Sequence, residues 1–194
     1  MPSAAAAFRR LVEVFDRLSV PYLVGGSVAS SVHGIYRSTN DVDFIVQFSE
    51  RDISPLVAEL GSEFYADPDM MREALRHQRS FNLIHYASSG KFDVFPLPDD
   101  PFSRTELARG AMEEATLAGG EIIRCKVASA EDTILSKLVW YRAGGEQSER
   151  QWNDLRGLRA VRGSSLDRSY LEKWAVYLQV PDLLERLFAE QEAL

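Results

Sequence analysis

Apolar residues recur at helical and strand spacings along the first third of the chain. Between residues 8 and 18 they fall three and four positions apart, which is the pattern of a helix with one buried face. From Val42 to Phe48 every second residue is apolar, which is typical of a strand with one buried face. The predicted elements are, in order, a helix over 8–18, a strand over 20–24, a helix over 28–33 that ends at Gly34, a strand over 42–48, and a helix that begins at Ser54 and Pro55.

The rest of the chain is predicted to contain two hairpins followed by helices. The hairpins join strands 81–86 and 92–95, and strands 113–117 and 121–125, through the short turns 87–90 and 118–120. The segment 96–104 carries three prolines and is predicted to be a loop. A helix capped by the Ser129 hydroxyl is expected to run to Arg142, and a second helix follows from Ser148. We therefore expect an α+β core over 1–127, with a helical C-terminal region over 128–194 packed on it.

Composition is consistent with a compact protein that needs no disulfide. The chain has 194 residues, 45% of them hydrophobic, and a single cysteine, Cys125, which we expect in a strand as a small core or edge residue. No apolar run reaches the length of a membrane span, and the N-terminal segment lacks the apolar region of a signal peptide, so we expect a cytoplasmic protein. The formal charge of −7 argues against broad nucleic-acid affinity, although a small nucleic-acid target stays open.

The candidate chemistry lies in three short segments. Asp41 and Asp43 are two residues apart at the start of a predicted strand, so their side chains point the same way. An isolated pair of this kind is better explained as the polar face of a half-exposed strand. However, residues 25–27 read Gly-Gly-Ser between a strand and a helix, where glycine allows close backbone approach and the free N–H groups of a helix start bind phosphate. Asp93 lies inside an otherwise apolar strand, where a carboxylate is costly unless a cation meets it.

Taken together, these segments resemble the nucleotidyltransferase superfamily of the DNA polymerase beta type. Other phosphate motifs fit poorly, because no lysine follows the glycines and their spacing is not G-x-G-x-x-G. The resemblance implies a mixed β-sheet flanked by helices, and three carboxylates that hold two Mg²⁺ ions, or Mn²⁺, around a nucleoside triphosphate. It assigns Asp41 and Asp43 to both metals, and Asp93 to one metal beside the attacking hydroxyl. It assigns Gly25, Gly26 and Ser27 to the phosphates.

A second set of residues lies in the predicted C-terminal helices. Lys137 sits among apolar neighbours, where a lysine usually extends to solvent, and Arg150 and Asp154 are one helical turn apart and can simply pair. Together with Arg142, these residues resemble the downstream motif of the AbiEii-like nucleotidyltransferases, a toxin group of toxin–antitoxin systems, although Gln151 and Trp140 depart from that pattern. The resemblance implies nucleotide contacts for Lys137, Arg142 and Arg150, an orienting or acceptor role for Asp154, Arg37 and Thr39, and a cognate antitoxin as a partner.

Two functions from different classes are compatible with these residues. The first is metal-dependent transfer of a nucleoside monophosphate to a hydroxyl acceptor, which is a tRNA end, a protein or a small molecule such as an aminoglycoside. The second is a catalytically silent nucleotide-binding or antitoxin-like partner with the same fold. Asp93 among apolar neighbours favours the enzyme, and hard carboxylate ligands without a histidine or cysteine cluster favour magnesium over zinc.

Overall fold

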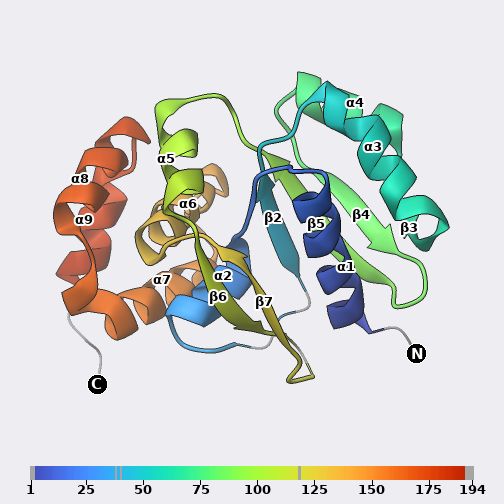
Figure 1. Cartoon of the computed structure of the whole chain (residues 1–194). Coiled ribbons are helices and arrows are strands. Elements are labelled where there is room, and N and C mark those ends of the chain that lie inside the picture. Colours follow the sequence, from blue (N-terminus) through green and yellow to red (C-terminus); the bar gives the residue numbers. More distant parts are fainter. Residues whose placement is uncertain (1–2, 38, 40, 118, 191–194) are drawn as a thin grey trace.

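The computed structural model describes residues 3–37, 39, 41–117 and 119–190 (Figure 1). Ala118 of the second predicted turn and the last four residues of the predicted helical region lie outside the described residues. The strands are β1 (Tyr22–Val24), β2 (Val42–Val46), β3 (Phe64–Tyr65), β4 (Phe81–His85), β5 (Gly90–Pro96), β6 (Ala111–Thr116) and β7 (Ile122–Val127). The α-helices are α1 (Ala4–Arg17), α2 (Gly26–His33), α3 (Glu50–Leu60), α4 (Pro68–Arg76), α5 (Pro101–Arg109), α6 (Ala130–Ala143), α7 (Glu149–Arg162), α8 (Arg168–Tyr177) and α9 (Pro181–Ala189). Short 3₁₀ helices cover Gly61–Glu63 and Gly163–Ser165.

The strands form a seven-stranded mixed sheet in the order β3-β4-β5-β2-β1-β7-β6. Strand β2 lies in the middle, antiparallel to β1 and parallel to β5. Both predicted hairpins are present as the antiparallel pairs β4–β5 and β6–β7. The mixed sheet flanked by helices is therefore confirmed.

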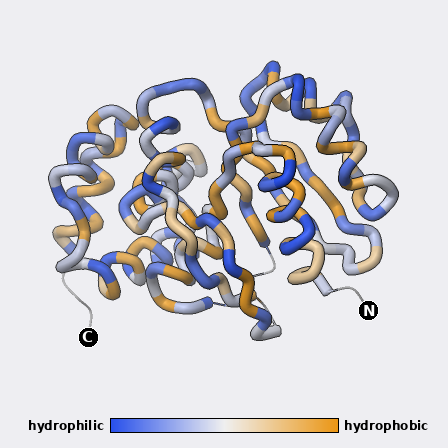
Figure 2. Tube along the Cα trace, viewed as in Figure 1, coloured by the Kyte–Doolittle hydropathy of each residue, from blue (hydrophilic) through white to orange (hydrophobic). Residues whose placement is uncertain are grey.

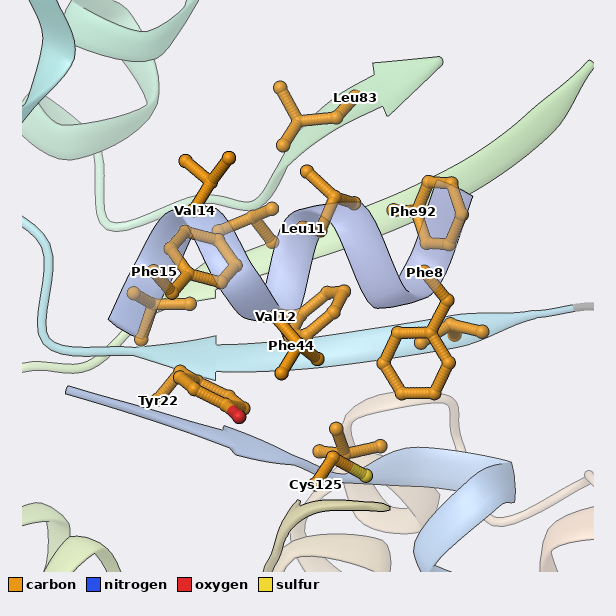
Figure 3. Close-up of a cluster of buried hydrophobic side chains, with 14 of the residues drawn as sticks. Phe8, Leu11, Val12, Val14, Phe15, Tyr22, Phe44, Leu83, Phe92 and Cys125 are labelled. Atoms are coloured by element: carbon orange, nitrogen blue, oxygen red, sulfur yellow. The ribbon is translucent and has the colours of Figure 1, made fainter. Parts of the chain in front are cut away.

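One face of the sheet is covered by α1, α3 and α4 (Figure 1). The Phe44 side chain of β2 is fully buried there, and its ring lies 5.4 Å from that of Phe8 and 5.2 Å from that of Phe15, in edge-to-face arrangements (Figure 3). Cys125 is buried in the same cluster, and burial raises the pKa of its thiol to about 12. The cysteine is thus an unreactive core residue, as predicted.

Helices α5 to α9 enclose a second apolar cluster on the other side of the central strands (Figures 1 and 2). Trp152 of α7 and Leu138 of α6 are buried in it, together with Phe102 of α5. Helix α5 therefore packs with the C-terminal helices, although it precedes β6 and β7 in the sequence. In the described part of the chain, no helix has both the length and the apolar character that crossing a bilayer requires.

Three predictions about individual elements were wrong. Helix α5 begins at Pro101 inside the predicted loop, because the Asp100 carboxylate caps the N–H groups of Phe102 and Ser103, and proline suits the first turn of a helix. Helix α3 begins at Glu50 rather than at Ser54, because a capping box starts it at residue 49. Strand β3 and helix α4 were missing from the prediction altogether.

A buried carboxylate joins α6 to α5 and α8. Asp132 has no exposed surface, and its oxygens accept hydrogen bonds from the Tyr170 hydroxyl at 2.5 Å, the Ser129 hydroxyl at 2.6 Å and Arg109 Nε at 3.3 Å. We expect Asp132→Ala to lower the free energy of unfolding by about 3–5 kcal/mol, because it leaves three partly buried donors, one of them the charged Arg109, without this acceptor. Urea unfolding would measure this, with Asp182→Ala at an exposed ion pair as the control that changes little. Equal unfolding midpoints for the two variants would contradict a structural role for Asp132.

Candidate active site

Asp43 and Asp93 lie side by side at the centre of the sheet. Strands β2 and β5 are parallel neighbours, and their register places these two residues opposite each other on the face away from Phe44. Burial, together with the charge of Asp93, raises the pKa of Asp43 from 3.8 to about 6. Lys137 and the Ser27 backbone amide offset this only in part. Ionising the Asp43 carboxylate therefore costs free energy in the folded protein.

Asp41 lies just before β2, and its side chain is 66% exposed. Its Oδ2 atom is 3.4 Å from Nη2 of Arg150. The buried Thr39 hydroxyl accepts a hydrogen bond from the Asp41 backbone N–H at 3.1 Å and so fixes the backbone that presents this carboxylate. Thr39 therefore holds the backbone of Asp41, and its orienting or acceptor role in the reaction stays a prediction.

The Gly-Gly-Ser turn packs directly against these carboxylates. The Gly25 N–H donates a hydrogen bond to the Asp43 carbonyl oxygen at 2.9 Å. Gly26 has a φ of +55°, and a Cβ atom there would lie 1.7 Å from Oδ2 of Asp43, so only glycine fits. Helix α2 begins at Gly26, which places the unpaired N–H groups of its first turn beside Asp43.

Two arginines and a lysine surround the turn. The Ser27 hydroxyl accepts hydrogen bonds from Nη2 of Arg37 at 2.7 Å and from Nη2 of Arg150 at 3.5 Å. Lys137 is only 8% exposed, and its Nζ lies 2.8 Å from Oδ2 of Asp154, so the alternative that it extends to solvent is wrong. Asp154 also pairs with Arg37 at 3.4 Å, whereas Arg150 reaches Asp41 and Ser27 instead of Asp154. These three cations therefore gather around the turn and around Asp154.

Arg142 lies elsewhere, which corrects its predicted place among the nucleotide contacts. Its guanidinium donates to the Gln179 carbonyl oxygen, between α8 and α9, at 3.1 Å and to Asp182, in the first turn of α9, at 2.5 Å. The reason is helical geometry, because a residue five positions after Lys137 points to a different side of α6.

Sequence reasoning missed the cation that meets Asp93. Lys91 lies two residues earlier on β5, and its Nζ is 2.9 Å from Oδ1 of Asp93. Asn82 of β4 lies opposite Asp93 in the sheet. The alternation of β5 was a signal for Lys91, since residues 91 and 93 of a strand share a face.

The donor atoms around Asp43 suit a hard divalent cation. Carboxylate oxygens are the ligands that Mg²⁺ prefers, and a bound cation would offset both the burial and the neighbouring charge of Asp93 that raise the pKa of Asp43. Within the described residues, no group of three acidic, histidine or cysteine side chains forms a ready-made metal site. The reason is that Asp41 faces Arg150 and Asp93 faces Lys91. These residues fit a magnesium ion once the two carboxylates leave their cations.

Comparison with known proteins gives similarity in structure only. No family model matches the sequence, and no curated protein does. The solution structure of the antibiotic-resistance factor ANT(2'')-Ia is similar, with a TM-score of 0.53 and 16% identity over 94% of this chain and 95% of that one. An antigenic nucleotidyltransferase-like protein from Paracoccidioides brasiliensis has a TM-score of 0.53 and 17% identity over 97% and 93%. A crystal structure of ANT(2'')-Ia with adenylyl-2''-tobramycin has a TM-score of 0.50 and 14% identity over 91% and 96%.

These similarities span nearly the whole of each chain, and at such low identity they establish the fold alone. The protein has the nucleotidyltransferase fold, with C-terminal helices, as the motifs predicted. Closeness to the AbiEii-like group has no support from them and stays a prediction.

Proposed function

We propose that this protein is a metal-dependent nucleotidyltransferase that moves a nucleoside monophosphate from a nucleoside triphosphate to a hydroxyl acceptor. The observation that carries the proposal is the register of Asp43 beside Asp93, directly against the Gly-Gly-Ser turn. Similarity in fold to a structure that contains an adenylylated aminoglycoside supports a small-molecule acceptor. A toxin–antitoxin setting rests on the sequence resemblance alone.

One set of groups in the site acts on the triphosphate, and another acts on the acceptor hydroxyl. The backbone N–H groups after Gly26, with Arg37, Lys137 and Arg150, hold the triphosphate and stabilise the pyrophosphate as its bond to the α-phosphorus breaks. Asp93 accepts the proton of the acceptor hydroxyl as the new oxygen–phosphorus bond forms. Magnesium held by Asp41, Asp43 and Asp93 would supply Lewis-acid stabilisation of the phosphate charge.

The alternative is a silent nucleotide-binding protein, or an antitoxin-like partner, with the same fold. The observation in its favour is that Asp41 and Asp93 are already paired with Arg150 and Lys91. A protein that never binds metal could keep that arrangement.

Transfer of label distinguishes the two. The protein is incubated with Mg²⁺ or Mn²⁺ and each α-labelled nucleoside triphosphate, with RNA, cell protein or tobramycin as the acceptor, and with EDTA as the control. The enzyme is expected to give a labelled product that EDTA abolishes. Tight nucleotide binding without any product would favour the silent protein.

Replacing Lys137 tests whether the C-terminal helices belong to the nucleotide site. We expect Lys137→Met to weaken ATP binding about tenfold and AMP binding much less, because the lost contact is to the β- or γ-phosphate. The free energy of unfolding should also fall by about 1–3 kcal/mol, because buried Asp154 loses one of its two cations. Calorimetry with magnesium measures both nucleotides, with Lys126→Met on an exposed position of β7 as the control. Unchanged ATP affinity in Lys137→Met would leave the ion pair with Asp154 as purely structural.

A further inference from the structure

An exposed aromatic side chain lies on the same side of the sheet as Asp93 and has no part in the mechanism above. Trp140 of α6 is 53% exposed, whereas Trp152 and Trp174 are 2% and 6% exposed. Its ring lies 5.5 Å from that of Phe95, at an interplanar angle of 68°. An indole is large and apolar, and one left open next to polar catalytic groups is typical of a ligand-binding surface.

The position of this pair follows from the strand and the helix that carry it. Phe95 comes two residues after Asp93 on β5, so it shares the Asp93 face of the sheet at a distance of about 7 Å along the strand. Trp140 comes three residues after Lys137 on α6 and so lies on a neighbouring part of the helix surface. Ile45 is the cross-strand neighbour of Phe95, and its side chain packs against Gly25, so it lies between Phe95 and the turn.

The order of groups across the sheet separates this pair from the phosphate turn. Gly26 is in contact with Asp43 of β2, and Asp93 lies one strand further on, in β5. In phosphoryl transfer the attacking and leaving oxygens are roughly in line, so an acceptor approaches from the side opposite the pyrophosphate. With the pyrophosphate at the turn, the acceptor comes from the side of Asp93, where Phe95 shares the same strand.

We infer that Phe95 and Trp140 form the acceptor subsite, and that the acceptor presents a hydroxylated saturated ring, as in a carbohydrate. This inference rests on the proposed function. Such a ring offers C–H groups to an aromatic face and hydroxyls at its edge, one of which reaches Asp93. An amino substituent on the ring would add a favourable cation–π contact with Trp140.

The charges of the site favour a carbohydrate over an RNA end. Among the described residues, the basic side chains of the site are paired with carboxylates: Lys91 with Asp93, Lys137 and Arg37 with Asp154, and Arg150 with Asp41. The chain as a whole carries a formal charge of −7. When Asp41 and Asp93 take up the metal, they release Arg150 to the triphosphate and Lys91 beside Asp93, whereas an extended nucleic-acid backbone binds through several unpaired lysine and arginine side chains.

Binding of a chosen glycoside tests the subsite. Calorimetry with Mg²⁺ and a non-transferable ATP analogue measures the affinity for tobramycin in the wild type and in Trp140→Leu, Phe95→Ala and Trp174→Phe. We expect tobramycin to bind the wild type and Trp174→Phe equally, and to bind Trp140→Leu and Phe95→Ala at least tenfold more weakly. Affinity for the ATP analogue should be the same in all four proteins.

A fluorescence titration adds a readout that a purely structural role would not change. Since Trp140 is the exposed tryptophan of the three, tobramycin should shift the emission of the wild type and of Trp174→Phe, whereas the emission of Trp140→Leu should not respond. Equal tobramycin affinity in the wild type and Trp140→Leu, no binding to the wild type, or a response to a short RNA in place of tobramycin would each overturn the subsite. Failure of the wild type to bind the ATP analogue would instead overturn the proposed function.

Discussion

Asp43→Asn is expected to reduce nucleotidyl transfer at least a thousandfold and to leave the protein as stable as the wild type, or more stable. The amide cannot supply the charge that a divalent cation needs. A thousandfold loss of rate corresponds to an activation barrier that is higher by about 4 kcal/mol. Stability should not fall, because the ionised Asp43 carboxylate is half-buried beside Asp93 and its pKa is raised to about 6. A group whose pKa is raised by folding destabilises the native state once it ionises.

Because only the ionised Asp43 carboxylate destabilises the native state, the difference in stability between the wild type and Asp43→Asn depends on pH. Below about pH 3 Asp43 is protonated in both the folded and unfolded states, and the variant gains nothing. As pH rises from about 4 to above 6, the unfolded carboxylate ionises more readily than the folded one, so the wild type loses stability relative to the variant, by about 1–3 kcal/mol at pH 7. Urea unfolding in magnesium-free buffer at pH 4 and pH 7 measures the difference.

The exposed loop acid Asp99 provides the control. Asp99→Asn should change neither the transfer rate nor the pH dependence, because its side chain is 87% exposed and its partner is Arg104 on the surface. Full transfer activity in Asp43→Asn would refute the assignment of the metal site. A sharp loss of stability in that variant would indicate that Asp43 has a structural role instead.

The sequence contained the local parts of the site but not their long-range partners. The Gly-Gly-Ser turn and the start of β2 were predictable, because glycine, a helix start and strand alternation are properties of neighbouring residues. The register of Asp43 with Asp93 depends on how α3, β3 and α4 return the chain to the sheet, and strand spacing alone does not determine that. The family resemblance predicted that these carboxylates belong to one site, and the sheet register is consistent with it.

The ion pairs were the least predictable feature. Arg150 and Asp154 have the spacing of a helical pair, yet Asp154 bonds Lys137 and Arg37, and Arg150 reaches Asp41 across 109 positions of sequence. Which of these charged side chains form ion pairs depends on which helices pack together at the edge of the sheet. Helix α5, in contrast, has a local signal in the sequence, since Asp100 caps it and Pro101 begins it. That signal lies in a segment with three prolines, which favours the prediction of a loop.

Gly26→Ala is expected to abolish ATP binding, with an affinity at least a hundredfold lower than that of the wild type. A Cβ atom at this position would lie 1.7 Å from Oδ2 of Asp43, so the carboxylate must move and the turn can no longer approach a phosphate. Ser27→Ala should weaken binding only about tenfold or less, since it removes a single hydroxyl and keeps the backbone N–H groups.

The chain offers a matched control for the backbone strain that alanine introduces at a positive φ. Gly61 has a φ of +52°, close to the +55° of Gly26, and has open space where its Cβ would lie. Both alanine variants should therefore lose about 1–3 kcal/mol of stability, because a side chain is strained at these positive φ values, whereas Gly61→Ala should bind ATP as the wild type does. Calorimetry and urea unfolding on the two variants separate the strain from the contact with Asp43. If Gly26→Ala and Gly61→Ala bind ATP equally well, the turn does not hold the phosphates, and the triphosphate must instead be bound by the side chains of Arg37, Lys137 and Arg150.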